Sequence, residues 1–178
     1  LIPKVKTNMA KEIDNPFSPD NVCKTLFDSG LITEKQKKGI MNKKDDVFKK
    51  LEARRAKKSA LLPPGNRIEN PITIIDVISS LKLKRKDKTA WHLDEEIIFQ
   101  VLTKKWGIPY KKIDPLELDL NVVTTTIPKI FALKHLVLPV EIQNGVLTIA
   151  TPDPFNLEAL QDVARATSME VKTVVSPK

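Results

Sequence analysis

The segment 137–150, with the sequence VLPVEIQNGVLTIA, limits how this chain can fold more than any other. Two apolar stretches flank Asn144-Gly145, a residue pair that accepts the positive φ angles of a two-residue hairpin turn. Pairing outward from that turn places Val140 opposite Ile149 and leaves one face of the hairpin apolar. That face holds Leu138, Val140, Ile142, Leu147 and Ile149. The side chains that point away from it are Glu141, Gln143 and Thr148.

Helical signals surround this hairpin. Thr126-Ile127-Pro128 opens a helix before it, and Asn156 caps a second helix after it, with apolar residues at core spacing. Residues 171–175 form a further strand. We therefore predict an α+β fold, in which an N-terminal helical region is followed by a small α/β layer with a three-stranded, mainly antiparallel sheet. The expected order is helix–strand–strand–helix–strand, with a helix on the one apolar face of the hairpin.

The first part of the chain is dominated by helix-start and helix-stop signals. Ser18-Pro19-Asp20 begins a helix that Gly30 ends. The capping box formed by Thr33 and Gln36 begins a second helix, so a short helical hairpin is expected. A strongly helix-forming stretch follows from Asp45 to about Leu62.

Breaks in these patterns divide the chain into segments. Residues 72–83 are apolar and ambiguous between helix and strand, and we favour a helix; a later helix is capped by Asp94 and stopped by Gly107. The expected segments are a flexible lead-in over 1–17, a basic helical region over 18–62, a linker over 63–70, a helical subdomain over 71–112 and a small α/β subdomain over 113–178.

The net charge of +8 is concentrated in the first two thirds of the chain. Residues 34–60 contain eleven Lys and Arg against four Asp and Glu, whereas residues 113–178 contain five against eight. The basic stretch has two interpretations: a surface for anionic lipid or nucleic-acid phosphates, or a solvated helix face with Lys/Glu pairs. Phe48 is the only aromatic residue in that stretch, which argues against base stacking.

The chain offers few groups for bond chemistry. Cys23 is the only cysteine, which excludes an intramolecular disulfide and a multi-cysteine zinc site, and the only histidines are His92 and His135. No G-x-x-x-x-G-K-[ST], G-x-S-x-G or H-E-x-x-H motif occurs. The carboxylate pairs Asp45/Asp46 and Glu95/Glu96 do not converge, because neighbours on a helix point about 100° apart. We therefore expect no catalytic residue, no cofactor and no metal.

Several stretches resemble a known module. They read LDEEIIFQVLTKKWGIPYKKIDPLELD, IPKIFALKHLVLPV and NGVLTIATPDPFNLEALQDVARATSMEVKTVV. In this order, from Leu93 onward, they are similar to the N-terminal domain of the type II secretion and type IV pilus assembly ATPases, the general secretory pathway protein E N-terminal family. LFDSGLITEKQ (26–36) resembles the helical-pair unit of that family. Members that bind cyclic di-GMP begin each unit with Arg-Leu-Gly. The matching positions here hold Asn21, Val22 and Cys23, and in a second copy Thr73, Ile74 and Ile75.

The resemblance implies a docking and regulatory module rather than an enzyme. It implies a parent ATPase whose phosphate-binding loop lies beyond Lys178, and a motor coupled by protein–protein contacts to the cytoplasmic domain of an inner-membrane platform protein. Its own ATPase domain and an anionic membrane surface are further expected partners, and no nucleic acid is expected. The expected location is cytoplasmic and peripheral at the inner-membrane face. The alternative is a cyclic-dinucleotide or nucleic-acid binding module that uses the basic face.

Candidate contact residues lie on the basic helix, on two helices of the α/β subdomain and on an edge strand. They are Lys49, Lys50, Arg54, Arg55, Ile130, Phe131, Lys134, Leu157, Val171 and Val174.

Overall fold

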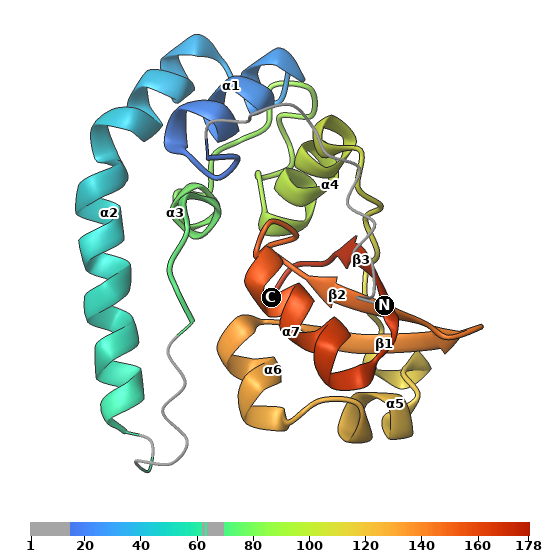
Figure 1. Ribbon diagram of the computed structural model, residues 1–178. Coiled ribbons are helices and arrows are strands. Elements are labelled where there is room, and N and C mark those ends of the chain that lie inside the picture. Colours follow the sequence, from blue (N-terminus) through green and yellow to red (C-terminus); the bar gives the residue numbers. More distant parts are fainter. Residues whose placement is uncertain (1–14, 62, 64–69) are drawn as a thin grey trace. The chain divides into compact units, whose positions relative to one another are not determined.

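The computed structural model describes residues 15–61, 63 and 70–178. It divides into two compact units (Figure 1). We call them the helical unit, which holds the described residues up to Trp106, and the sheet unit, residues 107–178. Residues 1–14 of the expected lead-in and 64–69 of the expected linker lie outside the described residues.

Helix α1 (Pro19–Asp28) begins and ends where its capping signals predict. The Ser18 Oγ accepts a hydrogen bond from the backbone N–H of Asn21 at 3.3 Å. Pro19 occupies the first turn, where its missing N–H removes no helical hydrogen bond. Gly30, just beyond the helix, has a φ of +72°, a conformation that glycine adopts without steric cost.

Helix α2 (Glu34–Ala60) joins two stretches that the sequence pattern treats separately. The predicted capping box is confirmed: the N–H of Thr33 donates to the Gln36 side chain at 2.8 Å, and the N–H of Gln36 donates to Thr33 Oγ1 at 3.2 Å. The helix then runs on through Asp45 to a length of 27 residues. No proline interrupts it, so one long helix replaces the expected pair.

Helices α3 (Ile74–Ser80) and α4 (Glu95–Trp106) complete the helical unit. The preference for a helix at 72–83 is confirmed, and Thr73 with Asp76 forms a second capping box. Asp94 caps α4 by accepting from the N–H of Ile97 at 2.9 Å, as predicted. The largest fully buried side chains of this unit are Leu26, Ile32, Ile40, Ile75, Ile78, Leu93, Ile98, Phe99 and Leu102.

The sheet unit confirms the predicted α+β class and element order. It contains the 3₁₀ turn η2 (Pro115–Glu117), α5 (Leu120–Thr125), α6 (Lys129–His135), β1 (Leu138–Gln143), β2 (Val146–Thr151), α7 (Leu157–Thr167) and β3 (Glu170–Val175). Strands β1 and β2 pair antiparallel, and β3 joins β2 in parallel, so the sheet is mixed in the order β1-β2-β3. The parallel pairing follows from α7, which returns the chain to the starting end of β2. The turn η2 and helix α5 are features that the sequence pattern did not reveal.

The hairpin turn is confirmed, but its register is not regular. Asn144 and Gly145 have φ values of +50° and +77°, and Ile142 lies opposite Leu147 as predicted. The expected pairing of Val140 with Ile149 is wrong, because Pro139 takes that place and the register shifts between Pro139 and Glu141. Val140 is therefore the extra residue of a β-bulge, and the side chains before and after it exchange faces.

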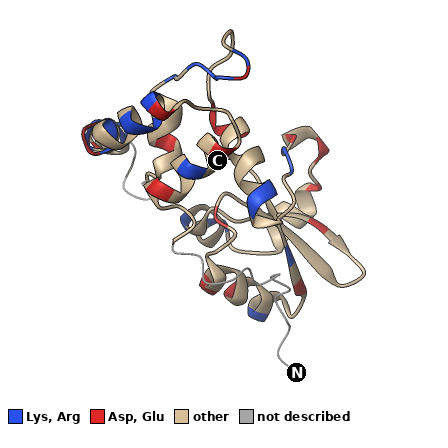
Figure 2. Ribbon diagram, turned by 90° about the horizontal axis from the view of Figure 1, so that it is seen from above, with Lys and Arg blue, Asp and Glu red and all other residues tan. Residues whose placement is uncertain are grey.

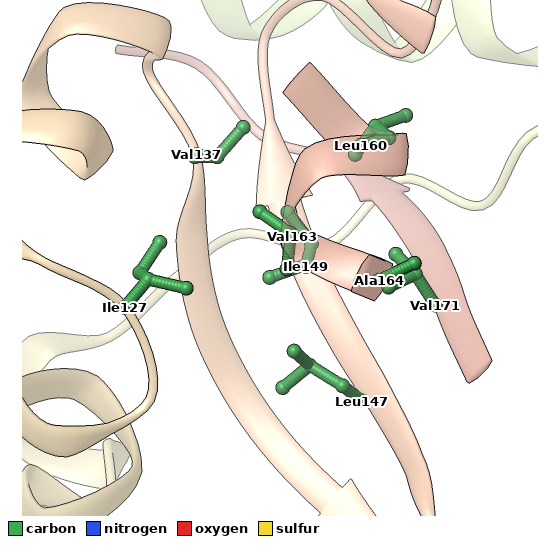
Figure 3. Packing of buried hydrophobic residues seen from close by; sticks show 8 residues of the cluster. All are labelled: Ile127, Val137, Leu147, Ile149, Leu160, Val163, Ala164 and Val171. Atoms are coloured by element: carbon green, nitrogen blue, oxygen red, sulfur yellow. The ribbon is translucent and has the colours of Figure 1, made fainter. Parts of the chain in front are cut away.

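The bulge gives the sheet two apolar faces instead of the one expected. One face packs against α6 and α7, and Figure 3 shows its eight central side chains. They are Ile127, Val137, Leu147, Ile149, Leu160, Val163, Ala164 and Val171. On the other face, Val140, Ala150 and Val174 are covered by Ile113, Leu118 and Leu138. Leu138 and Val140 thus leave the face that holds Leu147, which corrects the predicted arrangement.

Two glycine substitutions should change stability in opposite directions. Gly145→Ala is expected to lower the free energy of unfolding by about 1 kcal/mol, because an alanine at a φ of +77° is strained. Gly39→Ala should raise it by roughly 0.5–1 kcal/mol, since Gly39 lies inside α2 and no atom stands within 4 Å of the added Cβ. Urea unfolding of both variants measures the change in the free energy of unfolding. A lower free energy of unfolding in both variants would contradict the description of Gly39.

Candidate interaction surfaces

Cys23 and His135, two of the reactive side chains singled out in the sequence, are both engaged in packing. Cys23 is fully buried, and burial raises the pKa of its thiol to about 11, which disfavours the nucleophilic thiolate. His135 packs against Phe131, with ring centroids 4.5 Å apart. Within residues 15–61, 63 and 70–178, no group of three or more His, Cys, Asp and Glu is placed to hold a metal ion.

Helix α6 presents an apolar strip on the sheet unit. Ile130 is 77% exposed and Leu133 is 39% exposed, and their spacing of three residues puts them on one side of the helix. Lys134 is exposed beside them. Phe131, also a predicted contact residue, is only partly exposed, because its ring packs against the buried cluster beneath the helix. We call Ile130, Leu133 and Lys134 the α6 surface.

The predicted contacts on α7 and β3 are only partly accessible. Leu157, at the first turn of α7, is 44% exposed. Val171 and Val174 are 0% and 7% exposed, which corrects their assignment as contact residues. Each is covered on its own face of the sheet, Val171 by α7 and Val174 by the opposite apolar layer. The edge strand was identified correctly, but Val171 and Val174 each face part of the core.

The basic residues of α2, which Figure 2 colours along the ribbon, differ in their exposure. Lys49, Lys50 and Arg54 are exposed, as expected for a contact surface. Arg55 is half-buried, and its guanidinium donates a hydrogen bond to the backbone carbonyl of Asn70. Arg55 therefore stabilises the packing of the helical unit rather than facing a partner.

A polar groove of about 670 Å³ lies on the sheet unit, and the sequence analysis did not propose it as a site. Its polar lining comes from alternate positions on one side of the three strands: Glu141, Gln143, Thr148, Glu170 and Lys172, with Pro109 at its rim. The outward direction of Glu141, Gln143 and Thr148 is confirmed. In β3, Glu170 and Lys172 stand at alternate positions, so their side chains share one side of the sheet. This alternation is the sequence signal that could have revealed the rest of the groove.

In the part of the chain that the structure describes, none of the helices combines the length and the apolar character that crossing a bilayer requires.

The sheet unit is similar to part of several known proteins. Residues 106–178 match the MshEN domain. The type IV pilus assembly ATPase PilB of Myxococcus xanthus is 30% identical over 84 residues, 47% of this chain and 15% of that protein. The type IV pilus assembly ATPase TfpB of Acinetobacter baylyi is 33% identical over 78 residues, 44% of this chain and 13% of that protein. The match thus spans less than a sixth of the length of either relative.

A solved structure has the same fold over most of the chain. The structure of MshE with cdg (cyclic di-GMP) superimposes with a TM-score of 0.56 and 19% identity, covering 88% of this chain and 89% of that one. At this identity the likeness shows the fold alone. The family match coincides with the sheet unit, and it confirms the resemblance drawn from the sequence motifs. Residues 106–178 of the chain are therefore similar to the MshEN domain, and this part of the chain is similar in sequence to the type IV pilus assembly ATPases.

Proposed function

We propose that this chain is the N-terminal docking and regulatory module of a pilus-assembly or secretion motor ATPase. In this role it couples the motor to the cytoplasmic domain of an inner-membrane platform protein, and it works on the cytoplasmic side of that membrane. The observation that carries the proposal is the α6 surface, an exposed apolar strip on the part of the chain that is similar to the MshEN domain. Catalysis of ATP hydrolysis belongs, in this proposal, to a separate domain of the parent protein.

The α6 surface has the composition of a protein contact. Ile130 exposes 77% of its surface on an amphipathic helix whose other side is anchored by Phe131 and Ala132. Covering such a side chain contributes about 1.5–3 kcal/mol, which is a large share of a moderate affinity. Lys129 and Lys134 flank the strip and suit a partner with acidic residues at the rim. The occupant expected here is an amphipathic helix with an acidic border.

Substitutions on α6 test this proposal directly. The double variant Ile130→Ser/Leu133→Ser should weaken binding to the purified platform-protein domain by about tenfold or more, because it removes the apolar anchors. Isothermal titration calorimetry measures the change in Kd. The matched control is Leu116→Ser, which removes a leucine that is 94% exposed elsewhere on the same unit and should leave Kd unchanged. Equal weakening by both variants, or by neither, contradicts docking through α6.

A second candidate function is cyclic-dinucleotide binding, which the likeness to MshE with cdg favours. The helical unit has a cleft of about 280 Å³ beside Phe17, Phe48 and Thr73. Lys44 lines this cleft, and its Nζ is already 2.8 Å from the Asp45 carboxylate. Asn21 and Thr73 stand where an arginine begins the family's binding unit, so neither position supplies a guanidinium to a phosphate.

Titration with cyclic di-GMP separates the two functions. Under the docking proposal, the purified chain shows no saturable heat with this ligand at physiological salt. Saturable binding that persists when the salt concentration is raised, and that Lys44→Gln weakens, would move the assignment to the second function. A purely electrostatic interaction would instead fade with salt.

A further inference from the structure

The exposed cations of α2 form a line along one side of the helix. Lys43, Lys50, Arg54 and Lys57 are all exposed. Their spacings of seven, four and three residues place them within a sector of about 60° around the helix axis. At 1.5 Å per residue, the line is about 21 Å long. We call these four residues the α2 stripe.

The acidic residues of the same half of the helix lie mostly elsewhere. Asp45 and Glu52 project from the side roughly opposite the stripe, as the 100° rotation per residue requires. Asp45 also accepts a hydrogen bond from Lys44 at 2.8 Å, so its carboxylate is already paired. Asp46 alone borders the stripe. The α2 helix is thus basic on one side and carries both charges on the other. A helix that is merely solvated would not require this separation of charge.

We propose that the α2 stripe binds the surface of an anionic lipid bilayer. Because the four cations share a sector of about 60°, one plane along this side of the helix can meet them together. Each cation adds to the attraction, which extends over about one Debye length. Three of the four are lysines, whose compact charges suit a diffuse field of phosphates. The four side chains of the stripe are all charged, so their attraction to the bilayer is electrostatic. Leu61, which caps α2 four residues after Lys57, is 85% exposed and adds an apolar side chain at the end of the line.

Nucleic acid fits this surface less well. The only aromatic side chain of α2, Phe48, is half-buried and is not available for stacking on bases. A helix in the major groove has phosphates along both of its sides, which would face Asp45 and Glu52 with like charge. A plane touches one side of the helix only, and the charge pattern of α2 matches that geometry.

Vesicle sedimentation with charge-matched variants tests the stripe. The probes are vesicles of phosphatidylcholine containing phosphatidylglycerol, and vesicles of phosphatidylcholine alone, each at low and at physiological salt. The unsubstituted chain should sediment with the anionic vesicles only, and less at higher salt. Lys50→Gln/Lys57→Gln should reduce the partition coefficient about tenfold or more, since it removes two cations of the stripe.

The matched control is Lys38→Gln/Lys49→Gln. It removes the same charge from exposed lysines of the same helix, but on the side that holds Asp45 and Glu52. It should change the partition coefficient by less than about twofold. Equal loss in both variants would show that net charge alone drives binding and would overturn the proposal. Far-UV circular dichroism checks that both variants keep their helix content.

Two further outcomes are decisive. Binding to phosphatidylcholine alone, or binding to a DNA duplex that is tighter than binding to anionic vesicles at equal phosphate concentration, would reject a lipid surface as the partner.

The proposal is independent of docking through α6. Ile130→Ser/Leu133→Ser should leave vesicle binding unchanged, and Lys57→Gln, which lies outside the candidate protein contacts, should weaken vesicle binding and leave the platform-protein Kd unchanged. Failure of either proposal can therefore be recognised separately.

Discussion

Leu160→Ala should lower the free energy of unfolding of the sheet unit by about 2–5 kcal/mol. Leu160 is 1% exposed and packs from α7 onto the cluster that contains Ile149 and Val171 (Figure 3). Truncation removes apolar contacts and leaves a cavity. The sheet cannot move to fill this cavity, because hydrogen bonds hold its strands in two pairings. Amide hydrogen exchange in β1, β2 and β3, followed with increasing urea, measures the loss of unfolding free energy within the sheet itself.

The control for this substitution is Leu116→Ala in the turn η2. Leu116 is 94% exposed, so its truncation should change the unfolding free energy by no more than about 0.5 kcal/mol. A comparable loss of unfolding free energy in the two variants would mean that removing any leucine has this effect, whether the leucine is buried or exposed. A change below about 1 kcal/mol for Leu160→Ala would contradict the packing of α7 on the sheet.

Cys23 should react with a thiol reagent about a hundredfold more slowly in the native chain than an ordinary cysteine at about pH 8. Burial, aided by the charge of Asp20, raises the pKa of its thiol from 9.0 to about 11, so the thiolate fraction falls by about that factor. Full burial of the side chain adds a barrier to access. The rate of reaction with Ellman's reagent, before and after unfolding in urea, measures the difference. Rapid labelling of the native chain would contradict the burial of Cys23 in α1.

The same group predicts a pH dependence of stability. The unfolded chain releases the Cys23 proton near pH 9.0, whereas the folded chain holds it until about pH 11. The unfolded state therefore gains free energy from ionisation first, and stability falls as the pH rises through this window. Comparing the chain with Cys23→Ala isolates this contribution, because the variant lacks the titrating thiol and its stability should fall less steeply.

Signals that act within one turn of the chain were predictable from the sequence. Ser18, the capping box of Thr33 and Gln36, and Asn156 each satisfy backbone groups three residues away, so the local sequence is sufficient. The Asn144-Gly145 turn is local in the same sense. Its residues adopt positive φ angles whatever the strands pack against.

Features set by distant contacts were not predictable in this way. The bulge at Val140 depends on how Pro139 meets β2, and it decides which side chains face α7. Val171 and Val174 lie on an edge strand, and this position alone predicts that they are contact residues. Their burial depends on covering segments that lie elsewhere in the chain. Arg55 resembles its neighbours in sequence, and only its hydrogen bond to Asn70 distinguishes its role.

The backbone at the beginning of the sheet unit lies beside its last strand. The N–H of Lys111 donates to the carbonyl of Val175 at 2.9 Å, and the N–H of Val175 donates to the carbonyl of Pro109 at 2.8 Å, in a parallel bridge. A mechanical load that pulls the two ends of this unit apart therefore acts along the paired segments. It strains both bonds together instead of peeling them one after the other, and the unit transmits tension without first unravelling from either end.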